Sequence, residues 1–259
     1  MDRCESMNRR RFADGSCITN VLLEVCATSV STARAAERGG ADRIELCANL
    51  AVGGITPDPA LLASVLRAVS IPVHVLIRPR AGDFVYTAAE FDCMCRQIEA
   101  ARSAGAAGVA MGILLPDGQI DVPRTRALAQ LARPLHVTFH RAFDETPHPF
   151  DGLEDVIRSG ADTLLTSGGA PDIVRGSAAI ARLREQAGPR LQIMAGGGLN
   201  LGNLAGFART TGVFCLHGSF RRDSGLPRRG ADRAEQRVRE AAQLLRTAFF
   251  EAAEPQPVV

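Results

Sequence analysis

Two short segments of the chain carry the same uncommon combination of a carboxylate and a thiol. Glu24-Val25-Cys26 returns as Glu45-Leu46-Cys47, and both the carboxylates and the thiols are offset by 21 positions. Each triplet ends a short apolar run typical of a β-strand, along which side chains alternate between two faces. We therefore expect both carboxylates and both thiols on one face of two neighbouring parallel strands. A buried carboxylate must be neutralised, hydrogen-bonded or paired with a cation, so this set predicts a functional site.

Two arginines follow the third apolar run, in the segment Arg78-Pro79-Arg80-Ala81-Gly82-Asp83-Phe84-Val85-Tyr86. A loop that holds the guanidinium groups of Arg78 and Arg80 is suited to bind an anion. Arg78 also has the alternation parity of the strand interior. Salt bridges from Arg78 to Glu24 and Glu45 are therefore an alternative that the sequence leaves open.

A histidine ends a later apolar run, in the segment Thr138-Phe139-His140-Arg141-Ala142-Phe143-Asp144. One short loop separates His140 from Asp144, so we expect the two side chains to lie close together. A histidine with a nearby carboxylate can act as a general acid or base, or as an oriented metal ligand. The alternative is a hydrogen bond between His140 and Asp144 that only closes the loop.

Small residues follow the last three apolar runs, in Thr166-Ser167-Gly168-Gly169, Gly196-Gly197-Gly198 and His217-Gly218-Ser219. Barrels often bind phosphate at this position through backbone N–H groups. Glycine also serves tight turns, so the pattern gains its meaning from its place in the chain. The anion-binding residues that it predicts, besides Arg78 and Arg80, are Ser167, Gly168, Gly197, Gly198, His217 and Ser219.

The hydrophobic pattern predicts the elements that bring these motifs together. Eight short apolar runs alternate with helical segments such as Ala88–Ala104, and several of these begin at a cap or a first-turn proline, as at Thr56-Pro57. Along the runs, the residues at every second position are apolar, and the residues between them include the glutamates, cysteines and histidines named above. This pattern predicts an α/β fold, a single-domain (β/α)₈ TIM barrel, with its chemistry at the C-terminal ends of the strands.

The composition narrows the class of protein. The 259 residues are 46% hydrophobic and 22% charged with a formal net charge of +2, which favours neither nucleic acid nor a membrane surface as partner. We find neither a bilayer-spanning run nor a secretion signal, and seven cysteines without a framework spacing predict free thiols in a cytoplasmic protein. We expect a flexible N-terminal extension at 1–20, the barrel at 21–250 and a C-terminal tail at 251–259.

The quoted blocks, together with Gly53-Gly54-Ile55-Thr56-Pro57 and the residues from Gly39 to Cys47, resemble the copper homeostasis protein CutC family. The resemblance runs from about Leu22 to about Asp223. It implies a TIM barrel, a cytoplasmic setting, a homo-oligomer and Cu(I) bound by cysteines, here Cys26 and Cys47. Leu76 stands where methionine is common in the family, which removes a possible thioether ligand.

Two functions are consistent with these observations. Cu(I) is a soft ion that prefers thiolates, which favours copper binding and copper homeostasis through Cys26 and Cys47. Hard oxygen ligands and guanidinium groups do not favour Cu(I), so the alternative is an enzyme, a lyase, isomerase or hydrolase, acting on a small anionic or phosphorylated metabolite. Its general base would be one of the two glutamates, its general acid the histidine, and its catalytic residues Glu24, Glu45, His140 and Asp144.

Overall fold

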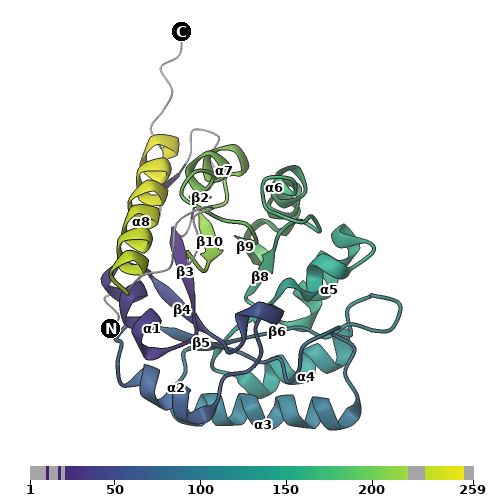
Figure 1. Ribbon diagram of the computed structural model, residues 1–259. Coiled ribbons are helices and arrows are strands. Elements are labelled where there is room, and N and C mark those ends of the chain that lie inside the picture. Colours follow the sequence, from purple (N-terminus) through teal and green to yellow (C-terminus); the bar gives the residue numbers. More distant parts are fainter. Residues whose placement is uncertain (1–9, 12–16, 19–20, 221–230, 254–259) are drawn as a thin grey trace.

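The computed structural model describes residues 10–11, 17–18, 21–220 and 231–253 and contains the closed barrel that the sequence predicts (Figure 1). Within these residues, parallel strands follow one another around the barrel in the order β10-β3-β4-β5-β6-β7-β8-β9. The strands are β3 (Leu22–Ala27), β4 (Arg43–Leu46), β5 (Val73–Leu76), β6 (Gly108–Met111), β7 (His136–Phe139), β8 (Thr163–Thr166), β9 (Gln192–Gly196) and β10 (Cys215–Gly218). The predicted TIM-barrel fold is confirmed.

Helices surround the ring of strands, and α8 lies against both α1 and α7 (Figure 1). The α-helices are α1 (Val30–Arg38), α2 (Pro59–Leu66), α3 (Ala88–Ala104), α4 (Val122–Ala132), α5 (Pro149–Ser159), α6 (Ser177–Ala187), α7 (Leu204–Thr211) and α8 (Ala231–Ala253). Short 3₁₀ helices are η1 (Leu50–Val52), η2 (Arg141–Glu145) and η3 (Gly188–Arg190). Within the described residues, no helix combines the length and apolar character that a bilayer crossing requires.

The predicted ends of the chain lie mostly outside the described residues. Strands β1 (Arg10–Arg11) and β2 (Cys17–Ile18) pair antiparallel within the segment expected to be a flexible extension. Helix α8 continues to Ala253, three residues past the expected end of the barrel at 250. The domain boundaries therefore stay predictions.

The alternation along the strands separates a helix-facing layer from a polar interior. Leu23, Ile44 and Val137 belong to the main hydrophobic core between strands and helices. Burial of each such side chain contributes about 1.5–3 kcal/mol to the stability of the fold. The opposite parity places Glu24 and Glu45 inside the barrel, where both are also buried. A polar barrel interior is thus a direct consequence of the alternation in the sequence.

Helix α2 begins two residues later than the sequence pattern indicates. Its N-cap is Asp58, whose side chain accepts a hydrogen bond from the Ala60 N–H at 2.7 Å, and Pro59 is its first residue. The Asp-Pro pair supplies the cap and the first-turn proline that we expected from Thr56-Pro57. Thr56 instead accepts a hydrogen bond from the Arg78 N–H at 2.8 Å, so it positions the loop after β5.

Candidate active site at the barrel mouth

A chain of ionisable side chains links β10, β3 and β4 inside the barrel. His217 Nδ1 lies 2.8 Å from Glu24 Oε1, and His217 Nε2 lies 3.8 Å from Glu45 Oε2. The other oxygen of Glu24 accepts a hydrogen bond from Arg43 Nε at 2.5 Å. The strand register explains these contacts, because Glu24 pairs with His217 on one neighbouring strand and with Arg43 on the other. Residues paired across parallel strands direct their side chains to the same face.

The surroundings shift the pKa values of the two carboxyl groups in opposite directions. Burial opposes the charged form of Glu24, but Arg43 and then His217 outweigh it and hold the Glu24 pKa far below its usual range. Burial raises the pKa of Glu45, which His217 opposes and Glu24 reinforces. Burial acts to lower the pKa of His217, but Glu45 and Glu24 reverse this and raise it. Glu24 is therefore a fixed anion, while Glu45 and His217 lie near enough for the charge of each to shift the pKa of the other.

These groups could also hold a cation. The nearest ligand atoms of Glu24, Glu45 and His217 all lie within 4.8 Å of one another. However, Glu24 already has Arg43 and His217 as partners, so a metal ion would compete with an existing ion pair. The geometry therefore suits proton transfer better than metal binding at this cluster.

The two thiols predicted as metal ligands touch each other. Cys26 Sγ and Cys47 Sγ lie 3.2 Å apart, and both are buried in an apolar cluster with Leu76, Ala110 and Leu50. The hydrogen bond to Cys47, followed by burial, raises the pKa of Cys26 well above its usual range. The Cys26 thiol therefore keeps its proton unless a cation displaces it.

The Arg78 guanidinium is buried and held by backbone carbonyls. Nη1 donates to Val52 O at 2.9 Å and to Gly54 O at 3.0 Å, and Nη2 donates to Gly82 O at 2.6 Å. Gly54 has a φ of +92°, and a Cβ there would lie 2.8 Å from Leu76 Cδ2. Only glycine therefore presents this carbonyl to Arg78 without strain.

The expected alternative of salt bridges from Arg78 to Glu24 and Glu45 is wrong. Arg43 pairs with Glu24 instead, and within the described part of the chain no carboxylate lies within salt-bridge distance of Arg78. The side chain of Arg78 is nevertheless buried, with the residue only 7% exposed. A buried cation without a compensating carboxylate favours an anionic ligand.

A cavity of about 90 Å³ lies among these groups. Two buried nitrogen atoms of residues that line it, His140 Nε2 and Arg78 Nε, have no hydrogen-bond partner among the described residues. Each unsatisfied buried donor costs about 1–3 kcal/mol, so the cavity is suited to a ligand that carries hydrogen-bond acceptors. The residues that line it are Glu45, Gly53, Leu76, Arg78, Phe84, His140, Arg141, Leu165 and His217.

The expected contact between His140 and Asp144 does not form. His140 is the N-cap of η2, and its Nδ1 accepts a hydrogen bond from the Ala142 N–H at 3.2 Å. Asp144 lies on the same 3₁₀ turn and pairs with Arg141 Nε at 2.7 Å. The tight turn points the carboxylate toward the loop after β8, away from the imidazole, so the two residues cannot act as an acid–base pair.

Asp144 occupies the backbone donors that the loop after β8 was expected to offer to an anion. Its carboxylate accepts hydrogen bonds from the N–H groups of Ser167 at 3.0 Å and Gly169 at 3.1 Å, and from Thr166 Oγ1 at 2.5 Å. The Gly168 N–H donates to Thr166 Oγ1 at 2.8 Å. The chain thus supplies its own anion here, and Ser167 and Gly168 are not free to bind an external one.

The other predicted anion-binding residues divide between the cavity and its surroundings. Arg80 donates to Glu90 at 2.5 Å and to Asp83 at 2.8 Å, so its guanidinium is committed to its own loop and to α3. Ser219 is exposed after the end of β10. Of the predicted set, Arg78 and His217 line the cavity. The residues that do not line it are Arg80, Ser167, Gly168, Gly197, Gly198 and Ser219.

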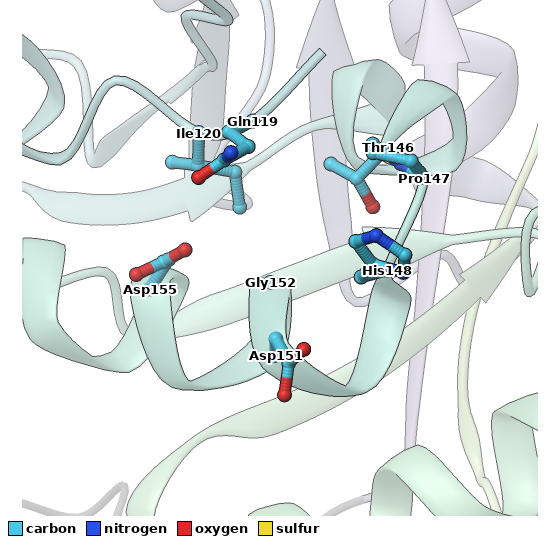
Figure 2. Close-up of a pocket in the computed structure, with 8 residues that line it drawn as sticks. All are labelled: Gln119, Ile120, Thr146, Pro147, His148, Asp151, Gly152 and Asp155. Carbon is cyan, nitrogen blue, oxygen red and sulfur yellow. The ribbon is translucent and has the colours of Figure 1, made fainter. Parts of the chain in front are cut away.

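A second cavity, of about 240 Å³, lies beside α5 and is larger than the first. Figure 2 shows Gln119 and Ile120 across the cavity from the α5 residues Asp151 and Asp155. Asp155 forms an ion pair with Arg158. None of the described polar side chains that line this cavity is both buried and without a hydrogen-bond partner. We therefore place the candidate site at the smaller cavity, where the buried donors are.

The sequence patterns assigned no role in the site to Arg43, Thr56 or Arg141, although all three position it. Arg43 lies two residues before Glu45 on β4 and points into the barrel like Glu45. The alternation along the strand was therefore sufficient to predict its direction. Arg141 lines the cavity and is held by Asp144 and by Ser167 Oγ at 3.0 Å. No local pattern in the sequence marks Thr56 as a contact of the loop after β5.

A closed ring of parallel strands with a charged interior and a cavity at its end places this chain in the TIM-barrel class. The sequence profile of the CutC family matches residues 21–222, and the chain belongs to the CutC family. The resemblance inferred from the motifs is confirmed.

The alignments with similar proteins span most of the chain. A family protein CutC from Chromobacterium violaceum is 50% identical over 200 residues, which are 77% of this chain and 81% of that protein. The human protein named copper homeostasis protein cutC homolog is 45% identical over 207 residues, which are 79% of this chain and 76% of that protein. A crystal structure of CutC from Streptococcus agalactiae matches with a TM-score of 0.74 and 31% identity, covering 77% of this chain and 99% of that one.

Proposed function

We propose that this protein is an enzyme that transfers a proton on a small anionic metabolite at the barrel mouth. The observation that carries the proposal is the buried Arg78 guanidinium, which has no carboxylate partner among the described residues and lies in the wall of the same cavity as Glu45. Such a cation favours an anion as ligand. The carboxylate of Glu45 can then exchange a proton with the bound ligand.

Three neighbouring side chains set the surroundings of Glu45 for this role. Arg43 keeps Glu24 ionised, and Glu24 in turn orients the His217 ring through the contact at 2.8 Å. His217 then faces Glu45 with its other nitrogen at 3.8 Å. Arg43, Glu24 and His217 are therefore positioning residues, and Glu45 is the group that faces the ligand.

Anion binding to matched arginine variants tests the proposal. Isothermal titration calorimetry with inorganic phosphate and with pyruvate should show that Arg78→Met weakens binding about a hundredfold, because a charged hydrogen-bond partner contributes about 1.5–3 kcal/mol. Arg80→Met is the control, since Arg80 lies on the same loop but pairs with Glu90 and Asp83. Arg78→Lys keeps the charge and should recover part of the affinity. Equal affinities of the Arg78→Met and wild-type proteins would contradict the proposal.

Copper binding is a second proposed function, favoured by a different observation. Cys26 and Cys47 lie in contact at 3.2 Å within an apolar cluster, and a buried pair of thiols is a donor set that Cu(I) prefers. The human relative is named a copper homeostasis protein. Binding would release the thiol protons, so Cu(I) affinity should rise with pH.

A competitive Cu(I) titration against a strong chelator under reducing conditions tests this second function. The Cys26→Ser/Cys47→Ser variant should lose tight binding, while Glu45→Gln should leave it nearly unchanged. Cys95→Ser is the matched control because Cys95 lies on α3, outside the thiol cluster. An unchanged affinity in the double variant would remove the copper function and leave the enzyme proposal intact.

We further propose that the protein is cytoplasmic and forms a homo-oligomer. Among the residues from 21 onward that the structure describes, the cysteines are free thiols, which suits a reducing compartment; they are Cys26, Cys47, Cys93, Cys95 and Cys215. The family resemblance supports the oligomer. Sedimentation of the reduced protein measures it, and a monomer at all concentrations would contradict this part.

A further inference from the structure

The hydrogen-bonding state of His140 is fixed by its surroundings. Its Nδ1 accepts a hydrogen bond from the Ala142 N–H at 3.2 Å. In a neutral imidazole one nitrogen accepts and the other carries the proton, so the proton of His140 lies on Nε2. The Nε2–H group is a buried donor without a partner among the described residues, and the ring lines the cavity.

The ring of His140 has little freedom to turn this donor elsewhere. The residue is 5% exposed, and its ring lies against Phe84 with 5.0 Å between the ring centroids. Just past the end of β6, a Cβ at Gly112 would lie 2.8 Å from Nδ1, so the backbone there approaches the ring as closely as glycine allows. The donor is therefore preorganised, which is what stabilisation of a developing negative charge requires.

His140 cannot act as the imidazolium acid that the sequence suggested. Burial, and then the positive charge of Arg78, lower the pKa of His140 to about 3, against weaker opposing effects of a hydrogen bond with its own backbone and of Asp144. The imidazole is therefore neutral throughout the physiological range. A neutral imidazole N–H can still donate to a carbonyl oxygen and stabilise the enolate that forms there.

We propose that His140 Nε2–H binds the carbonyl oxygen of a small α-keto acid and that the reaction is removal of a proton from the carbon next to that carbonyl. This inference rests on the proposed function and names its substrate class. The carboxylate of the α-keto acid pairs with Arg78, whose Nε–H is the second unsatisfied donor near the cavity. A cavity of about 90 Å³ has room for the carboxylate and carbonyl groups of such a ligand.

The step balances without an added oxidant or metal ion. The carboxylate of Glu45 takes the proton as the C–H bond breaks, and the electron pair of that bond forms the carbon–carbon double bond of the enolate. The carbonyl π electrons move onto oxygen, which accepts the hydrogen bond from His140. Return of the proton from Glu45 to carbon regenerates the keto acid, and delivery of solvent deuterium instead labels it.

Deuterium exchange into pyruvate tests the proposal with a defined probe. In deuterium oxide, the wild-type protein should exchange the methyl protons of pyruvate above the buffer rate, as followed by proton NMR. His140→Ala and Glu45→Gln should each lower the exchange rate about a hundredfold or more, the effect of removing one preorganised donor or the base. His148→Ala is the control, because His148 lines the other cavity and should exchange pyruvate as fast as the wild type.

A second measurement remains informative if the His140→Ala variant folds poorly. Nitrogen-15 NMR of labelled histidine in the wild-type protein should show His140 as the neutral Nε2–H tautomer from about pH 5 to 8, with a shift of that N–H on addition of pyruvate but not of propionate, which lacks the carbonyl oxygen. A proton on Nδ1, titration near the usual pKa, or no pyruvate exchange in the wild type would overturn the inference. If Arg78→Met loses pyruvate binding while His140→Ala exchanges normally, the proposed function stands and the inference falls. If neither variant changes binding or exchange, both fall.

Discussion

Replacement of His140 by glutamine should make the fold less sensitive to acid. Burial and Arg78 lower the pKa of His140 to about 3 in the folded protein, whereas an unfolded histidine titrates near 6.5. Between these values the unfolded chain binds the proton and the folded protein does not. Folding stability therefore decreases as the pH falls through 6.5, and this loss levels off near pH 3.

The size of the effect follows from the difference in pKa. Each unit corresponds to about 1.36 kcal/mol, so His140 lowers the free energy of unfolding by about 2 kcal/mol between about pH 7.5 and 5. Glutamine does not titrate and removes this contribution. His74, whose pKa is also lowered to about 3, first by burial and then by Arg43, is present in both proteins and cancels in the comparison.

Urea denaturation of both proteins at these two pH values measures the difference. The wild type should lose about 2 kcal/mol more than His140→Gln on acidification, even though the variant is less stable at neutral pH because the ring contacts are gone. An equal loss in both proteins would refute a neutral, buried His140. It would also remove the physical basis for its role as a neutral donor.

Three further changes test other parts of the site. Arg43→Met should cost about 3–5 kcal/mol of unfolding free energy in urea, because Glu24 is left as a buried charge without its cation; a cost under about 1 kcal/mol would contradict the pairing. Asp144→Asn should lower stability by about 2 kcal/mol and speed hydrogen exchange at the loop after β8, and unchanged exchange there would count against its bridging role. Leu76→Met should change stability by less than about 1.5 kcal/mol and, if the thiols bind copper, tighten Cu(I) binding roughly tenfold in the chelator titration. No gain in affinity would argue against a site beside Leu76.

The barrel and its inward-facing residues could be predicted because alternation is a local property of each strand. Glu24, Glu45 and His217 meet as the parity indicates, and Cys26 contacts Cys47. Side-chain direction along a strand follows from backbone geometry alone, so the amino-acid sequence was sufficient to predict this part of the site.

The partners of loop residues could not be predicted in the same way. Whether Asp144 turns toward His140 or toward Ser167 depends on the 3₁₀ turn η2 and on how closely the loop after β8 approaches it. Arg80 likewise finds Glu90 through the packing of its loop on α3. Contacts between loops depend on tertiary packing, which spacing along the chain does not encode.

Native mass spectrometry with metal analysis, performed on reduced protein purified without added metal, is the most decisive test of the anion-binding active site around Arg78. We predict a small carboxylated or phosphorylated compound that is retained by the wild-type protein and by Arg80→Met but is absent from Arg78→Met. Wild-type protein that carries no small anion, or an anion that Arg78→Met retains equally well, would contradict such a site.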